Sequence, residues 1–171
     1  MTLKQVFTFP DPVNDYAART VAAIIVVMAL GVLLFHQYWL LIPLAYGFLA
    51  RVLTGPTLSP AGLLATRLLV PRFIKRVKLT PGPPKRLAQS IGLLFSTTAL
   101  VLWLAGLLGA AQAVLAVLTL FAALEAVFAF CMGCFVFAQL MHAGLLPAAV
   151  CESCNNLSFT GHRPPTERPA S

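Results

Sequence analysis

Long apolar segments with very little charge constrain the fold of this chain more than any other feature. Of its 171 residues, 59% are hydrophobic and 10% are charged, whereas a soluble domain carries about 25% charged residues. The composition therefore predicts an integral membrane protein. In lipid the stability of such a fold depends on helix packing rather than on a core that excludes water.

Four hydrophobic segments are expected to form helices. They cover residues 17–35, 38–53 and 87–108, and a last run from Ala111 past His142. A helix needs roughly 20 residues (range about 17–25) to cross the hydrocarbon. The first and third segments fit this length, the second is marginal, and the fourth is long enough to tilt or to emerge from the bilayer. We expect an all-α membrane protein with four transmembrane helices in two hairpins and a short interfacial helix.

The loops predict the orientation of these spans. His36 and Gln37 separate the first two spans, and Gly109 and Ala110 separate the last two. Eight of the twelve basic residues lie between Arg51 and Arg86, with no acidic residue among them. They are Arg51, Arg67, Arg72, Lys75, Arg76, Lys78, Lys85 and Arg86. Because Lys and Arg stay on the cytoplasmic side, the loop that joins the two hairpins is expected to face the cytoplasm, and so are both termini. The chain is thus expected to be a multi-pass protein of the inner membrane. The positive charge does not indicate nucleic-acid binding.

The chain divides accordingly into six parts. They are a cytoplasmic N-terminal segment (1–16), a first hairpin (17–53), a basic cytoplasmic loop (54–86), a second hairpin (87–142), a segment with a second cysteine pair (143–157) and a disordered polar tail (158–171). Within the loop, Ser59 followed by Pro60 is typical of a helix start. We expect an interfacial helix over 60–70 that ends at Pro71, because proline disfavours helix in the residue before it.

Two C-x-x-C pairs carry the candidate chemistry. Cys131 and Cys134 lie within the fourth segment, and Cys151 and Cys154 follow after sixteen intervening residues. At about 1.5 Å per residue, a helix entering near Ala111 uses up a hydrocarbon core of about 30 Å close to the first pair. Both pairs are therefore expected on the cytoplasmic side, where the connecting segment is long enough for all four sulfurs to meet.

Three interpretations of these sulfurs stay open. A dithiol pair can exchange disulfides, one thiolate attacking and the other resolving the mixed disulfide. Because Cys131 is expected late in its helix, it lacks the helix N-terminus that lowers a thiol pKa, and the Cys151–Cys154 pair is expected to be the better nucleophile. Alternatively, C-x2-C-x16-C-x2-C fits a four-cysteine zinc or iron site with Cys131, Cys134, Cys151 and Cys154 as ligands. In the third interpretation the cysteines only pack helices.

Glu125 is the only acidic residue within a predicted span. A carboxylate at that depth is costly and normally points into the bundle. Its expected partners are the hydroxyl groups of Ser96, Thr97, Thr98 and Thr119. Glu125 and Cys131 do not share a helix face, so a proton relay to the thiols requires a distortion near Gly133. Otherwise Glu125 is expected to be protonated and to fix helix packing.

Four motifs of the chain carry a family resemblance. They are Gly55-Pro56-x-x-Ser59-Pro60, Pro71-Arg72, Pro84-Lys85-Arg86-x-Ala88-Gln89-x-x-Gly92 and Glu125-x-x-x-x-Phe130-Cys131-x-Gly133-Cys134. With these motifs the chain, over roughly residues 11–157, resembles domain-of-unknown-function family 4395, small bacterial inner-membrane proteins. The resemblance implies a polytopic membrane fold, with Cys131 and Cys134 as the family's cysteine pair and Glu125 as a family acid. It further implies a link to thioredoxin-like and rhodanese-like sulfur proteins, and no established reaction.

The leading hypothesis is a thiol–disulfide oxidoreductase or sulfur carrier in the membrane. Its catalytic residues would be Cys131, Cys134, Cys151, Cys154 and Glu125. Electrons or sulfane sulfur would pass between the membrane pair and a soluble thioredoxin-like or rhodanese-like partner, without a cofactor. The alternatives are a metal-binding scaffold that holds zinc or iron, and a small transporter subunit that uses Glu125. The lipid bilayer is the expected environment, no nucleic-acid partner is expected, and the sequence predicts no oligomeric state.

Overall fold

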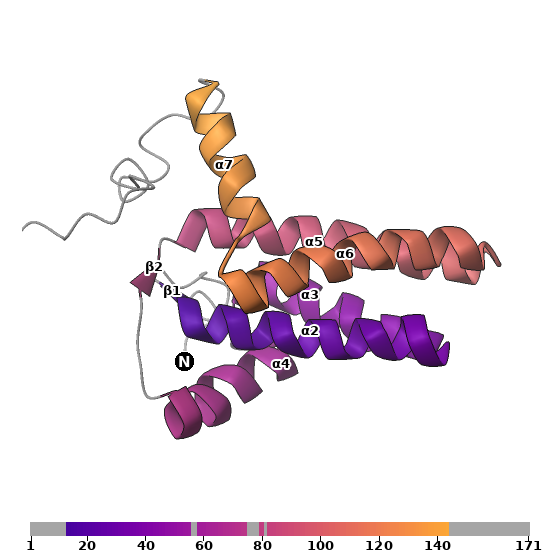
Figure 1. Cartoon of the computed structure of the whole chain (residues 1–171), viewed down its shortest axis with the longest axis horizontal. Coiled ribbons are helices and arrows are strands. Elements are labelled where there is room, and N and C mark those ends of the chain that lie inside the picture. The colour runs from indigo at the N-terminus through magenta and orange to yellow at the C-terminus, as the bar shows by residue number, and fades with distance from the viewer. Residues whose placement is uncertain (1–12, 56–57, 75–78, 81, 144–171) are drawn as a thin grey trace, which may run out of the picture.

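The computed structural model describes residues 13–55, 58–74, 79–80 and 82–143, which are almost entirely helical (Figure 1). In chain order the elements are β1 (Val13–Asn14), α2 (Asp15–Phe35), η1 (Tyr38–Leu40), α3 (Leu41–Thr54), α4 (Pro60–Leu63), η2 (Leu64–Ile74), β2 (Leu79–Thr80), α5 (Gly82–Leu104), α6 (Leu108–Phe128) and α7 (Met132–His142). The predicted all-α class is confirmed. The short antiparallel pairing of β1 with β2 was not predicted from the sequence.

Helices α2, α3, α5 and α6 form a bundle and lie alongside one another (Figure 1). Helix α2 packs mainly against α6, α3 against α5, and α5 against α6. Three of them, α2, α5 and α6, are long and apolar enough to cross a membrane. The apolar helix of Tyr38–Thr54, which combines η1 and α3, is shorter. Four complete spans in two hairpins therefore remain a prediction, while the described residues contain three helices that are long and apolar enough to span a membrane.

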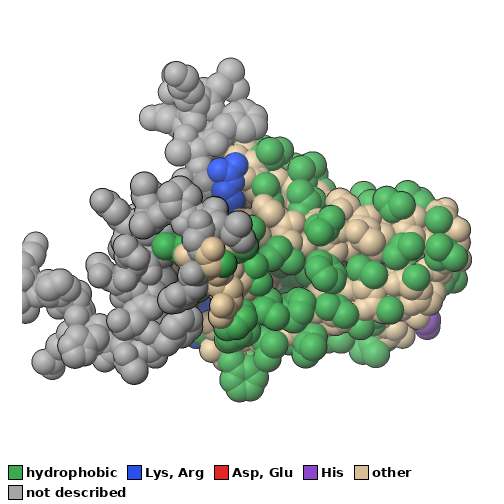
Figure 2. All heavy atoms as spheres, turned by 90° about the horizontal axis from the view of Figure 1, so that it is seen from above, with side chains coloured by type: hydrophobic (Ala, Val, Ile, Leu, Met, Phe, Trp, Pro, Cys, Tyr) green, Lys and Arg blue, Asp and Glu red, His purple; other side chains and the backbone are tan. Residues whose placement is uncertain are grey.

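The outer surface of the bundle is apolar, and small residues lie among the larger apolar side chains of its interior. Side chains such as Val27 and Leu94 point outward with 70% and 64% of their surface exposed, and hydrophobic side chains cover the face shown in Figure 2. Ala29, Ala99 and Ser96 are completely buried between helices. Small residues let helix backbones approach closely, which is the main source of packing energy in lipid.

Two helix boundaries differ from the prediction. Helix α5 begins at Gly82 rather than near residue 87, because Pro83 and Pro84 fall in its first turn, where a backbone N–H has no intrahelical acceptor. The turn between α5 and α6 lies at residues 105–107 rather than at Gly109. Gly106 takes a left-handed conformation there, with φ of +80°, which a residue with a side chain adopts at a cost.

The central segment is helical further than predicted. Ser59 is the N-cap, since its Oγ accepts a hydrogen bond from Gly62 N at 3.3 Å, which confirms the predicted start. Pro71 does not end the helix, because the chain continues as a π-helix to Ile74. In the wider π turn the ring of a proline no longer faces the carbonyl four residues earlier, the clash that breaks an α-helix. This segment packs on α2, and its placement in the interface plane stays a prediction.

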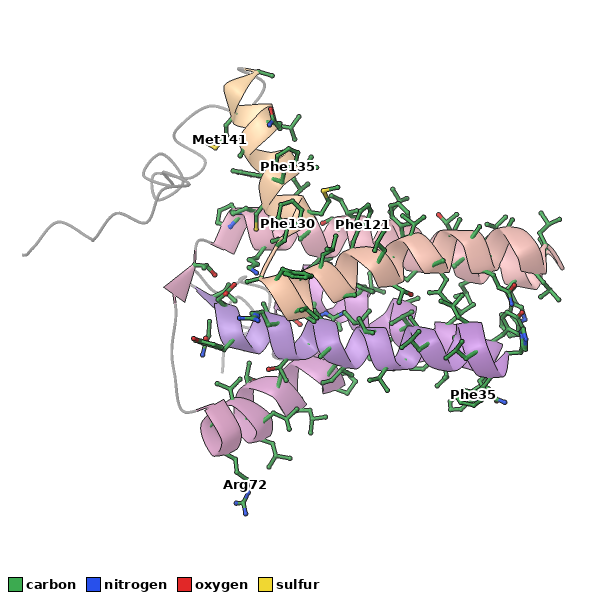
Figure 3. All side chains as sticks on the ribbon, in the orientation of Figure 1. Phe35, Arg72, Phe121, Phe130, Phe135 and Met141 are labelled. Carbon is green, nitrogen blue, oxygen red and sulfur yellow. The ribbon has the colours of Figure 1, made fainter. Side chains whose placement is uncertain are left out.

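The prediction of one continuous fourth helix is wrong, because two helices cover this segment. Helix α6 ends at Phe128, and α7 begins at Met132 and turns away from the bundle axis (Figure 1). Phe130 and Phe135 lie together at this junction, with ring centroids 6.1 Å apart (Figure 3). The break moves the first cysteine pair from the middle of a long helix to the start of a new one.

Candidate functional site

The end of the bundle at which α7 begins, here called the α7 end, gathers buried charges from three helices. The Nζ atom of Lys85 lies 3.0 Å from Asp15 Oδ1 and 2.8 Å from Glu125 Oε1. Lys85 and Asp15 are buried, with 4% and 6% of their surface exposed. A buried charge is tolerated when it is paired and hydrogen-bonded, and here a single ammonium group serves two carboxylates.

Local structure explains how these three residues meet. Asp15 opens α2 directly after its N-cap Asn14, whose Oδ1 accepts a hydrogen bond from Tyr16 N. The β1–β2 pairing holds residues 13–14 beside residues 79–80, which brings the start of α5 to the start of α2. Glu125 comes from the last turn of α6. The Asp15–Lys85–Glu125 cluster therefore joins the ends of three helices.

The cluster corrects two sequence-based expectations. Lys85 was expected in the basic cytoplasmic loop, but it lies in α5 and is buried against two acids. The expected hydroxyl partners of Glu125 are engaged elsewhere: Ser96, Thr97 and Thr119 each donate to a carbonyl of their own helix, and Thr98 is exposed. A hydroxyl in a helix readily bonds the carbonyl three or four residues earlier. A carboxylate inside a span calls for a cation, and Lys85 at the start of α5 was the signal in the sequence that could have identified its partner.

Specific hydrogen bonds define the break between α6 and α7. Ala129 is left-handed with φ of +58°, and Phe130 N donates to Leu124 O at 3.3 Å, as in a Schellman end. Arg19 of α2 donates to the carbonyls of Ala126 and Val127 at 3.0–3.3 Å. These bonds satisfy the terminal carbonyls of α6, and the positive charge lies at the negative end of its dipole. An alanine in the left-handed region costs roughly 1–2 kcal/mol, so the sequence does not reveal this break.

Cys131 is the N-cap of α7. Its Sγ accepts a hydrogen bond from Cys134 N at 3.3 Å. Cys131 is buried, Cys134 is half-buried, and both thiols are free of disulfides. The prediction that Cys131 lies late in a helix is wrong. The first pair occupies the helix N-terminus that the sequence-based argument assigned to the second pair.

This environment shifts the pKa values of the two thiols in opposite directions. The hydrogen bond from the Cys134 thiol lowers the pKa of Cys131 most, and the charge of Lys85 and the Cys134 N–H lower it further. Burial and the charge of Glu125 oppose these effects, but the net pKa of Cys131 is below the usual value. The same thiol–thiol hydrogen bond, with burial, raises the pKa of Cys134. Cys131 is therefore the thiol that ionises first, close enough to Lys85 and Glu125 to sense their charges.

Gly133 brings α7 into backbone contact with α5. A Cβ atom at this position would lie 2.5 Å from Ala88 N and closer still to two other atoms of Ala88. Ala88 is one turn beyond Lys85 on α5. The glycine inside the C-x-G-C motif thus lets the first turn of α7 press against α5 beside the charge cluster. The distortion expected near Gly133 exists, but it lies at residues 129–131.

Arg51 lies in the last turn of α3, within the first predicted hairpin. It is 2% exposed, and its guanidinium carbon lies 4.5 Å from the centroid of the Phe48 ring. Phe48 in turn packs directly on Gly92 of α5. Among the described residues, neither Nε nor Nη1 of Arg51 has a hydrogen-bond partner. Nothing in the sequence pattern distinguished Arg51 from the exposed basic residues that follow it.

Cys151 and Cys154 lie outside the described residues, as does the polar tail. The meeting of the two cysteine pairs therefore remains a prediction. In the part of the chain that the structure describes, no three His, Cys, Asp or Glu side chains are placed to hold a metal ion. The four-cysteine alternative needs two ligands beyond that part and is not tested by it.

Comparison with protein families agrees with the motifs. Residues 13–142 match the family described as "Domain of unknown function (DUF4395)". The chain belongs to the DUF4395 family. The match takes in every element from β1 to α7, and with them Asp15, Lys85, Glu125 and the first cysteine pair of this DUF4395 protein. Searches among curated proteins and among solved structures found no match.

Proposed function

We propose that this DUF4395 protein exchanges thiols and disulfides at a membrane, with Cys131 as the attacking thiol and Cys134 as the resolving thiol. One observation carries the proposal: Cys131 Sγ accepts the Cys134 N–H at the start of α7, beside a buried lysine. Backbone N–H groups at a helix start and a nearby cation both stabilise a thiolate, and the thiolate is the form that attacks sulfur. A cysteine placed for packing alone would need neither.

The reaction follows from the different ionisation of the two thiols. The Cys131 thiolate attacks one sulfur of a disulfide, forms a mixed disulfide and releases the other sulfur as a thiolate. Cys134 then loses its proton and attacks Cys131 Sγ, which releases the second sulfur and leaves a Cys131–Cys134 disulfide. The protein gives up two electrons, and the external disulfide takes them. With a persulfide as the reactant, the same attack transfers its outer sulfur to Cys131 instead.

Glu125 is the group we assign to receive the proton of Cys134. The charge of its carboxylate acts on both thiols. It is held in place by Lys85 at 2.8 Å. Cys134 must lose its proton before it attacks, and Glu125, at the end of the neighbouring helix α6, is the acid whose charge acts on Cys134. This assignment is the proton relay that the sequence left open.

We place the α7 end on the cytoplasmic side of an inner membrane. Three exposed arginines lie between the two hairpins in the chain: Arg67 and Arg72 in η2, and Arg86 near the start of α5. Arg72 points away from the bundle (Figure 3). Basic residues favour the cytoplasmic side. The partner is then a soluble thioredoxin-like or rhodanese-like protein, and the Cys151–Cys154 pair is the dithiol that returns Cys131–Cys134 to the reduced state.

Trapping of the mixed disulfide tests this function. Replacing the resolving thiol, Cys134→Ser, in cells should leave a partner covalently bound to Cys131, identified by mass spectrometry of the purified adduct. The matched control Cys131→Ser should trap nothing at Cys134. If Cys134→Ser yields no disulfide or persulfide at Cys131, the proposal is wrong. Stoichiometric zinc or iron that is lost on Cys151→Ser would favour the four-cysteine scaffold instead.

A further inference from the structure

A long π-helix lies in the segment that packs on α2. Helix η2, with 11 residues, follows α4 directly, and together they lie on the side of α2 away from α6 (Figure 1). π-helices are rare, are mostly limited to a single turn inside an α-helix, and are frequent at functional sites. The length of η2 therefore points to a role beyond the accommodation of Pro71.

The π-helix places two arginines on the same side of the segment. Arg67 and Arg72 are five residues apart, which is the spacing that the backbone hydrogen bonds of a π-helix join from one turn to the next. In an α-helix, residues five apart would point about 140° away from each other. Both side chains are exposed, and Arg72 points away from the bundle (Figure 3). The conformation of η2 thus pairs two positive charges at the surface.

This arginine pair has no carboxylate partner in the part of the chain that the structure describes. The acids of that part are Asp15 and Glu125, and Lys85 binds both. Like charges on successive helical turns destabilise the helix. An anion from outside the chain would remove this repulsion.

Apolar side chains adjoin the arginine pair on the exposed face. Leu64 and Leu68 expose 42% and 52% of their surface, whereas Ala65 and Val70 are buried. A helix with exposed leucines beside exposed arginines suits the boundary between lipid headgroups and acyl chains. An acidic protein surface would pair with the arginines but would leave the leucines without an apolar partner. The surface therefore fits a phospholipid better than a soluble protein.

We propose that Arg67 and Arg72 together bind the phosphate of an anionic phospholipid, whose acyl chains lie against Leu64 and Leu68. Guanidinium groups suit this ligand because their fixed donors match the oxygens of a phosphate. The cytoplasmic leaflet, on which we place the α7 end, carries the negative surface potential that attracts such residues. This inference does not rest on the thiol exchange and stands or falls separately from it.

Lipid binding to the purified full-length protein in detergent tests this site. Native mass spectrometry compares phosphatidylglycerol with phosphatidylcholine of the same short acyl chains, and phosphatidylglycerol should bind more tightly. Arg67→Gln and Arg72→Gln should each weaken phosphatidylglycerol binding about fivefold, which corresponds to about 1 kcal/mol per basic residue. Arg86→Gln removes the same charge from an exposed position of α5 and should change binding less than about twofold. If one of the two arginine variants does not fold, the other decides.

Four results would overturn the proposal. Equal binding of the two lipids would exclude recognition of the headgroup charge. Equal weakening by Arg86→Gln would show that net charge, rather than the arginine pair, attracts the lipid. Displacement of phosphatidylglycerol by inorganic phosphate would assign the pair to a free anion. Unchanged lipid binding in both arginine variants would leave an acidic protein surface as the occupant.

The acyl contact has a test of its own. Leu68→Gln leaves the charge unchanged and should weaken the binding of both lipids, because it removes apolar surface beside the arginine pair. The two lipids should keep the ratio of affinities that they have for the unmodified protein. Unchanged binding of both lipids to this variant would contradict the placement of the acyl chains against η2.

Discussion

Gly133→Ala should separate α7 from the charge cluster. The added Cβ would lie 2.5 Å from Ala88 N, where ordinary contacts begin at 3.4 Å. The first turn of α7 must therefore move by about 1 Å or more, since the obstacle is backbone of α5 and cannot rotate away. Overpacking of this kind typically costs about 1–3 kcal/mol. The displacement carries Cys131 away from Lys85 and removes part of the stabilisation of its thiolate.

The expected result is slower alkylation of Cys131 at neutral pH, with the pH of half-maximal rate shifted upward by up to about one unit. Gly109→Ala is the matched control, because a Cβ at Gly109 of α6 meets nothing within 4 Å. Both variants are compared by iodoacetamide labelling and mass spectrometry of the labelled cysteine. If Gly133→Ala reacts like Gly109→Ala at every pH, α7 is not held against α5 in the way described.

Three further outcomes are expected. Lys85→Met removes the cation beside Cys131, so site-resolved alkylation of this thiol should require a higher pH; an unchanged pH profile would show that Lys85 does not act on it. Arg19→Leu removes the donors that satisfy the last carbonyls of α6, and thermal unfolding in detergent should show a loss of about 1–2 kcal/mol that the exposed Arg86→Leu control lacks. In Gly92→Ala the added Cβ would lie 2.6 Å from Cζ of the Phe48 ring of α3, so overpacking should lower the melting temperature. A melting temperature at or above that of the unmodified protein would contradict this contact.

Apolar patterning was sufficient to predict the bundle. The segments beginning near Ala17 and Tyr38 and their short turn at His36 were predicted from hydrophobicity and length, and Ser59 was predicted as a helix start from its side chain. These features depend on local sequence, which is why they could be read from it.

The site depends on long-range packing, and the sequence revealed less of it. The cysteine pair and Glu125 were identified, but the break that places Cys131 at a helix start requires a left-handed Ala129, which local preference argues against. The break is compensated by Arg19, 107 residues away from the carbonyl it binds. Burial of Lys85 and Arg51 likewise results from neighbours on other helices, whereas in the sequence Lys85 stands in a basic loop and Arg51 near the end of a predicted span.

The pH dependence of the two thiols tests the central claim most directly. With Cys151 and Cys154 replaced by serine, alkylation of Cys131 and Cys134 is measured separately across pH by mass spectrometry. Because the pKa of Cys131 is lowered, its reaction should stay fast below the ordinary thiol value of about 8.5 and decline only as the pH falls through the lowered pKa. Cys134 should react slowly throughout this range. Equal titration of both thiols near the ordinary value, or faster reaction of Cys134, would contradict a thiolate held at the start of α7.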